Sequence, residues 1–159
     1  MQQLRAAGAN VNARSPEGNT SLINAVLESD FPQMDALIAL QADVDWPDDS
    51  GFSPLRVAIE NGFGLVVERL IDLDANVNAG DRYQITPLMA AARLSQVGMM
   101  NSLIKAGADQ FAKSMTGDNA VSLAIRGNAR QAQTLLFGPL GLTSVVSAVS
   151  NEPPILAGD

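Results

Sequence analysis

The same pattern of residues returns every thirty-three positions along this chain, and this periodicity limits the folds that are open to it. A leucine or valine, an alanine three residues later and a second leucine twelve residues after that keep one register. These positions are Leu22, Leu55, Leu88 and Val121; Ala25, Ala58, Ala91 and Ala124; and Leu4, Leu37, Leu70, Leu103 and Leu136. A unit of this length cannot bury its apolar face alone, so the pattern predicts a row of stacked copies.

The segment 51–79 shows most clearly which local structure each copy should form. Ser53 can cap a helix, because its hydroxyl accepts a backbone N–H that would otherwise lack a partner. Pro54 suits the first helical position, where its missing N–H is not needed. Asn61 and Gly62 end this short helix, and an amphipathic second helix follows. The register predicts first helices at Ser21–Glu28, Pro54–Asn61, Pro87–Arg93 and Ala120–Arg126.

This pattern resembles the ankyrin repeat. The Thr86-Pro87-Leu88 start and the thirty-three-residue period distinguish it from the tetratricopeptide repeat of thirty-four residues and from the longer HEAT repeat. The resemblance extends over roughly residues 1–137. It implies an all-α solenoid of stacked helix-turn-helix units with β-hairpin or turn fingers, and it implies a scaffold that binds another protein.

The register also divides the chain into segments. They are a half repeat (1–14), repeat one (15–47), repeat two (48–80), repeat three (81–113) and repeat four (114–137). Residues 138–150 could form a capping helix, and 151–159 form a tail or linker. Residues 1–14 match only the second half of a repeat. We therefore keep two interpretations, a fragment of a longer protein and a natural half-repeat cap.

Two glutamines stand where the repeat pattern has glycine. Gln41 follows the second helix of repeat one, where a glycine usually supplies a left-handed helix stop. Gln84 replaces the hairpin glycine of the other repeats. We therefore expect a weaker or differently built stop at Gln41 and an altered turn at Gln84.

Composition excludes several classes of function. The net charge of −7 argues against nucleic acid and against an anionic membrane surface, since both attract basic proteins. The sequence has no histidine and no cysteine, so the commonest general base and metal ligand and all thiolate chemistry are missing. No apolar stretch is as long as a membrane-spanning helix requires. The first residues lack the apolar core of a signal peptide, which favours a soluble cytoplasmic protein over a secreted one.

The acidic cluster before repeat two has some likeness to a calcium loop. An EF-hand needs glycine at its sixth position and glutamate at its twelfth. Counted from Asp43, these positions hold Asp48 and Pro54, so the site is rejected. No phosphate-binding glycine motif occurs either. The sequence therefore predicts no enzyme, no cofactor and no metal site.

With catalytic and metal sites set aside, the remaining candidate site is a protein-binding surface. In ankyrin-like stacks the hairpin tips and the exposed face of the first helices form a concave groove. Mapped by register, its protein-binding residues are Trp46, Asp49, Phe52, Glu60, Arg82, Tyr83, Ile85, Arg93, Leu94, Met115 and Arg126. The groove is acidic over repeats one and two and basic over three and four. Its centre gathers apolar side chains beside Arg82, as interface hot spots do. Trp46 either extends this surface or packs into the hairpin stem.

The leading interpretation is a protein–protein interaction scaffold that is monomeric or associates weakly through its open N-terminal end. Two alternatives remain. The chain could be an inhibitor or immunity protein that occludes a partner enzyme, or the targeting module of a larger effector or enzyme.

Overall fold

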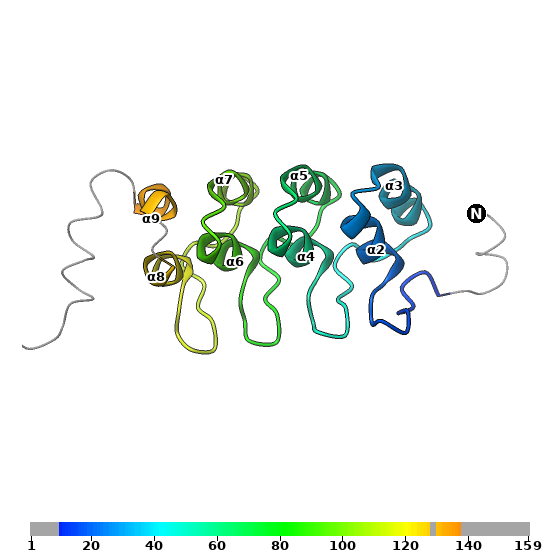
Figure 1. The fold of residues 1–159 in the computed structure, drawn as a ribbon, viewed down its shortest axis with the longest axis horizontal. Coiled ribbons are helices and arrows are strands. Elements are labelled where there is room, and N and C mark those ends of the chain that lie inside the picture. Colours follow the sequence, from blue (N-terminus) through cyan, green and yellow to red (C-terminus); the bar gives the residue numbers. More distant parts are fainter. Residues whose placement is uncertain (1–9, 128–129, 138–159) are drawn as a thin grey trace, which may run out of the picture.

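The computed structural model describes residues 10–127 and 130–137, which form eight helices in four antiparallel pairs (Figure 1). The pairs are α2 (Ser21–Glu28) with α3 (Phe31–Ala39), α4 (Pro54–Glu60) with α5 (Gly64–Asp72), α6 (Pro87–Arg93) with α7 (Val97–Lys105), and α8 (Ala120–Arg126) with α9 (Arg130–Phe137). The predicted half repeat lies mostly outside these residues, as do the proposed capping helix and tail.

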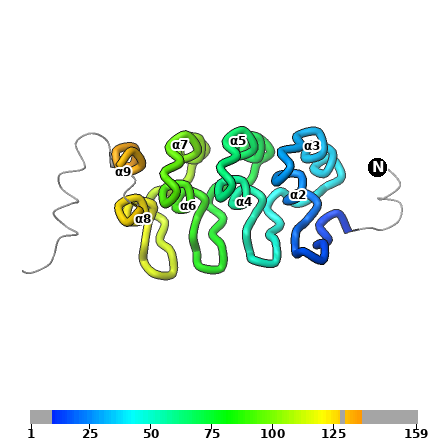
Figure 2. Tube along the Cα trace, viewed as in Figure 1, coloured from blue at the N-terminus to red at the C-terminus, as the bar shows by residue number. Residues whose placement is uncertain are grey.

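The pairs stand side by side in a row (Figure 2). The first helices form one layer through the contacts of α2 with α4, α4 with α6 and α6 with α8. The second helices form the other layer, in which α5 contacts α7 and α7 contacts α9. Loops project as fingers from the first-helix layer (Figure 1). This arrangement confirms the all-α ankyrin-type solenoid predicted from the repeats.

The fingers are built from turns. Within the described residues the β-structure consists of an isolated bridge between Arg14 and Thr20. The resemblance allowed either β-hairpins or turns as fingers, and the described fingers are turns.

Short polar residues start the first helices, as the sequence predicts. Thr20, Ser53 and Thr86 each accept the N–H of the residue three positions on, at 3.1, 3.2 and 3.3 Å. Asn119 forms a capping box with Ser122. Three of the four predicted first helices have the predicted bounds, whereas α4 ends one residue early, because Asn61 is its C-cap.

The repeated apolar positions form the core between neighbouring pairs. Leu22, Leu55 and Leu88 are buried, and so are the four alanines of the second register position. An alanine side chain lets neighbouring first helices approach closely, which explains its recurrence at this position. Val121, the last member of the leucine register, is only half-buried.

The two glutamines adopt the backbone conformation of the glycines that they replace. Gln41 has φ 68°, and Gly107, in the same register, has φ 91°. Gln84 has φ 60°, against 85° for Gly51. The stop at Gln41 is therefore not differently built, and the turn at Gln84 is not altered. Each glutamine bears the steric cost of a left-handed backbone, so the weaker stop at Gln41 stays a prediction.

Candidate protein-interaction surface

We use the name finger surface for the eleven residues that are predicted from the sequence to bind a partner: Trp46, Asp49, Phe52, Glu60, Arg82, Tyr83, Ile85, Arg93, Leu94, Met115 and Arg126. Trp46 lies near the end of repeat one, and the others lie on the fingers of repeats two, three and four and around the C-terminal ends of the first helices.

In the fingers of repeats two and three, the side chain of the first residue holds the turn in shape. Asp48 Oδ1 accepts the N–H of Phe52 at 2.9 Å. Asp81 Oδ1 accepts the N–H groups of Tyr83 and Ile85 at 2.8 and 3.0 Å. Side chains that accept nearby backbone N–H groups in this way fix a turn without a β-ladder. The finger tips are therefore held in defined positions.

Two large apolar side chains are exposed on neighbouring finger tips. Tyr83 is 61% exposed and Met115 is 70% exposed. The Met115 N–H donates to the Tyr83 carbonyl at 3.0 Å, which joins the two fingers. Arg82 reaches the other way, and its guanidinium donates to the carbonyls of Asp49 and Ser50 on the finger of repeat two. The three fingers are thus linked by hydrogen bonds close to their tips.

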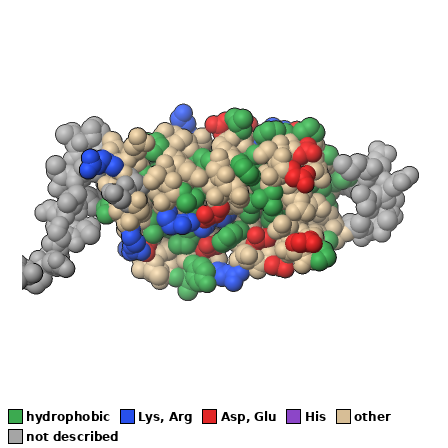
Figure 3. Space-filling view, viewed as in Figure 1, with side chains coloured by type: hydrophobic (Ala, Val, Ile, Leu, Met, Phe, Trp, Pro, Cys, Tyr) green, Lys and Arg blue, Asp and Glu red, His purple; other side chains and the backbone are tan. Residues whose placement is uncertain are grey.

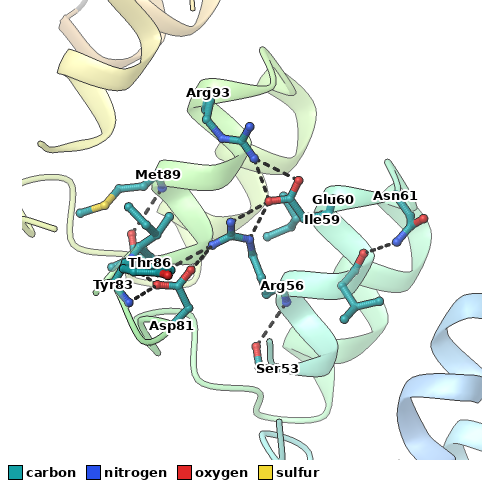
Figure 4. Close-up of polar contacts among 12 residues, drawn as sticks. Ser53, Arg56, Ile59, Glu60, Asn61, Asp81, Tyr83, Thr86, Met89 and Arg93 are labelled. Atoms are coloured by element: carbon teal, nitrogen blue, oxygen red, sulfur yellow. Dashed lines mark hydrogen bonds and ion pairs between the residues drawn. The ribbon is translucent and has the colours of Figure 1, made fainter. Parts of the chain in front are cut away.

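An ion network with a buried arginine at its centre lies at the base of this surface (Figure 4). Arg56, on α4, is only 6% exposed. Its guanidinium contacts Glu60 Oε1 at 2.7 Å and Asp81 Oδ2 at 3.4 Å, and it lies 4.9 Å from the centre of the Phe52 ring. Arg93, on α6, donates to both Glu60 oxygens at 2.9 and 3.1 Å. The network connects α4, α6 and two fingers, so it fixes repeats two and three relative to each other.

The finger surface is less apolar than the sequence suggests. Phe52, Ile85 and Leu94 are half-buried and pack against the core, whereas Tyr83 is exposed. Trp46 is 41% exposed, so its ring is partly covered. The exposed members are Trp46, Asp49, Arg82, Tyr83, Arg93, Met115 and Arg126, and Glu60 is half-buried.

Two residues of the ion network, Arg56 and Asp81, were not predicted from the sequence. A signal for Arg56 was present, because it lies on a short helix whose other central residues are apolar. A charged residue there requires a partner, since an unpaired buried charge is costly. Asp81 is that partner from the next repeat, and its position could be known only once the repeats were stacked.

The arginine of repeat four has a local partner. Arg126 donates to Asp118 at 2.8 and 3.1 Å. Hydrogen bonds from Thr116, then from Arg126 and Ser122, hold the pKa of the Asp118 carboxyl below its ordinary value. Asp118 is thus ionised at neutral pH and keeps the Arg126 side chain over the fourth finger.

Charge is unevenly distributed along the array. Repeat one contains no lysine or arginine, whereas basic residues outnumber acidic ones in repeats three and four. Figure 3 shows one face of the array, on which acidic side chains gather towards the N-terminal end and basic ones towards the C-terminal end. An ion pair between Arg14 and Asp49, at 3.3 Å, neutralises a small part of the acidic half.

Burial affects one carboxylate in the acidic half. Asp45 accepts the backbone N–H of Asn76 in the next repeat at 2.9 Å. Its partial burial raises the pKa of its carboxyl, an effect that this hydrogen bond opposes and the nearby Asp43 reinforces. Asn12 and Asn78, in the same register, accept the N–H groups of Asp43 and Asp109. The repeats are therefore linked by a ladder in which Asp45 is the charged member.

Within the described residues, no group of three or more potential ligands is placed to hold a metal ion. None of the helices in these segments is long and apolar enough to cross a membrane.

Stacked helix pairs with rigid projecting fingers define a repeat protein of the solenoid class. Two family models match the sequence of the same region. One, described as ankyrin repeats (3 copies), covers residues 1–81, and one described as ankyrin repeat covers residues 83–114. The chain belongs to the ankyrin-repeat family.

Its relatives are much longer proteins. The chain is 33% identical over 124 residues to a Danio rerio protein named as palmitoyltransferase ZDHHC13, covering 77% of this chain and 19% of that protein. It is 28% identical to human SH3 and multiple ankyrin repeat domains protein 2, covering 100% and 9%. It is 36% identical to the Drosophila melanogaster Neurogenic locus Notch protein, covering 69% and 4%. The chain thus spans less than a fifth of each of these relatives.

Proposed function

We propose that this chain binds another protein across repeats two and three, through the finger surface. The observation that carries the proposal is the exposed pair Tyr83 and Met115, held on fingers that hydrogen bonds and the buried Arg56 network keep in place. Binding through rigid side chains costs little conformational freedom. Tyrosine is also enriched among the residues that contribute most to binding.

The other members of the finger surface have supporting roles. Arg82 and Arg93 supply charged hydrogen bonds to the partner, which are stronger than neutral ones. Trp46, Asp49, Glu60 and Arg126 lie around the anchor pair, and the half-buried Phe52, Ile85 and Leu94 form the base on which it rests. The module acts by binding, with no catalysis and no cofactor of its own.

The relatives favour a module within a larger assembly. Ankyrin arrays are typically interaction modules, and a relative named as a palmitoyltransferase matches this chain over 19% of its own length. A targeting module of a larger effector or enzyme is therefore the second candidate. An inhibitor that occludes a partner enzyme would use the same finger surface and would differ in the partner bound.

The test begins with a partner identified by pull-down and mass spectrometry. Tyr83→Ala should weaken its binding by about 2 kcal/mol or more, as the loss of a central anchor does. Arg126→Ala, nearer the rim, should cost less and should mainly change the salt dependence of binding. Thermal melts of both variants serve as the control, because neither side chain is buried.

One result would contradict the proposal. If the Tyr83→Ala variant bound like the wild type while a substitution on the second-helix layer abolished binding, the finger surface would not be the docking site.

A further inference from the structure

A groove runs between α5 and α7 on the second-helix layer. It consists of two adjoining hollows of about 450 and 400 Å³, and Glu68 and Ser102 line both. One end is apolar, with Leu65, Val97 and Met99, while the other end has Asp72 and Lys105. Because a helix advances 1.5 Å per residue, a groove along both nine-residue helices is roughly 13 Å long. We call it the α5–α7 groove.

The preceding pair of second helices is bridged at the equivalent place. Arg69, on α5, donates through Nε to Asp35 Oδ1, on α3, at 3.1 Å, and a second guanidinium N–H reaches the same oxygen. One repeat later, Glu68 occupies the register position of Asp35, and Ser102 that of Arg69. The short serine side chain cannot reach Glu68, and no ion pair of Glu68 is present among the described residues. The α5–α7 groove therefore offers a carboxylate where the previous groove has a completed ion pair.

The apolar end of the α5–α7 groove contains a leucine that is largely exposed to solvent. Leu65 is 73% exposed, although it lies on a helix with a clear apolar inner face. Gly98, the residue in its register on α7, leaves open space beside it, since an added Cβ would meet nothing within 4 Å. An exposed leucine next to an open hollow is a suitable contact for an apolar side chain from another molecule.

We propose that the α5–α7 groove binds a helix of a partner protein. This helix presents an apolar side chain to Leu65 and Val97 and, one turn further on, an arginine or lysine to Glu68, in the space that Ser102 leaves open. Leu65, Glu68 and Asp72 follow one another at intervals of three and four residues on α5, so they lie on one face of it. A helix laid along the groove carries complementary groups at the same spacing.

Charge determines the chemistry of the partner. Glu68 and Asp72 outnumber Lys105 in the groove lining, so a basic helix is favoured over an acidic one. Arginine suits Glu68 best, because its planar guanidinium can bond a carboxylate at two atoms. This surface is separate from the finger surface, and the proposal does not depend on the function proposed for that surface.

The test uses a defined probe, a synthetic alanine-based helical peptide of about twenty residues, long enough to be helical in water. It carries leucine and arginine four residues apart on one face. One control peptide has glutamate in place of arginine, and another has alanine in place of leucine. Titration into the isotope-labelled protein should move the NMR signals of 64–72 and 97–105 with the leucine–arginine peptide, and far less with either control peptide.

Variants of the protein sharpen the result. Glu68→Gln and Leu65→Ser should each weaken binding of the leucine–arginine peptide about tenfold, the effect expected for a lost charged hydrogen bond or a lost apolar contact. The matched controls are Asp74→Asn, which removes a charge just after α5, and Phe111→Ser, which removes another exposed apolar side chain. Both controls should bind the peptide like the wild type.

The most direct variant is Ser102→Arg. This change places an arginine in the register position of Arg69, where it can pair with Glu68 as Arg69 pairs with Asp35. The new ion pair should fill the groove and abolish peptide binding without lowering the melting temperature. Unchanged binding by Ser102→Arg would overturn the proposal. So would signals that move mainly in repeat one or at the finger tips, or an absence of binding at millimolar peptide.

Discussion

The inner and outer first helices differ in how completely they are buried. Every residue of 54–59 in α4 and of 87–92 in α6 is buried, whereas α8 buries three of its seven residues. The inner helices have a first-helix neighbour on both sides: α4 contacts α2 and α6, and α6 contacts α4 and α8. In a linear array each repeat is stabilised by its own contacts and those of its neighbours. The centre of this protein should therefore be more stable than its flanks.

Inner and outer ion pairs of the first helices also differ in burial. The inner arginine, Arg56, is buried between two repeats, and its partner Asp81 is buried as well. The outer arginine, Arg126, is exposed and paired within its own repeat. The binding surface that we propose rests on the inner pair.

The largest effect is expected from truncating the core leucines. Leu88→Ala should lower the free energy of unfolding by roughly 2–5 kcal/mol, as buried leucines do. Val121→Ala, one repeat later, should lower it by about 1 kcal/mol, because a smaller, half-buried side chain is removed. Chemical denaturation followed by circular dichroism measures both. Equal losses would mean that Val121 contributes as much to stability as Leu88, and would contradict the difference in burial between inner and outer repeats.

The buried arginine gives the next largest effect. Arg56→Met should cost about 3 kcal/mol, because Asp81 would stay buried without its arginine. Arg126→Met should cost less than about 1 kcal/mol, as exposed ion pairs contribute little. The comparison can be made by thermal melts at low and high salt. A loss for Arg126→Met as large as that for Arg56→Met would remove the distinction between the two pairs.

The left-handed glutamines test whether a local effect depends on position in the array. Gln41→Gly, in the outer repeat one, and Gln84→Gly, in the inner repeat three, should each stabilise the protein by about 0.5–1 kcal/mol. Glycine removes the steric penalty of the left-handed backbone, and its greater freedom in the unfolded chain offsets part of this gain. Denaturation midpoints measure the gain, and destabilisation by either change would show that the glutamine side chain has an unrecognised packing role.

The smallest effect concerns the ladder between repeats. Asp45→Asn should raise the melting temperature slightly at neutral pH, since asparagine accepts the Asn76 N–H without a partly buried charge. The pKa of Asp45 is raised in the folded state, so its ionised form destabilises the fold at pH values above that pKa. The gain should fade as the pH falls through the raised pKa of Asp45, where the folded protein takes up a proton, and should be gone below the ordinary pKa of an aspartate. A gain that persists in acid would rule out this electrostatic cause.

Much of this architecture could be predicted from the sequence. The helix starts at Thr20, Ser53, Thr86 and Asn119 depend on short-range capping, which the local sequence specifies. The buried leucines and alanines follow from the thirty-three-residue register, because each repeat meets its neighbours through the same face. The exposure of Tyr83 and Met115 follows from their place at the finger tips.

The remaining features depend on which side chains face each other across neighbouring repeats. The register placed Phe52, Ile85 and Leu94 on the groove, but packing in the stack half-buries them. The burial of Arg56 depends on Asp81, twenty-five residues away in the chain. The open groove beside Glu68 depends on the length of the side chain at Ser102. Local sequence sets the helices and their register, whereas contacts between repeats depend on the size and charge of both partners, which only the stacked structure brings together.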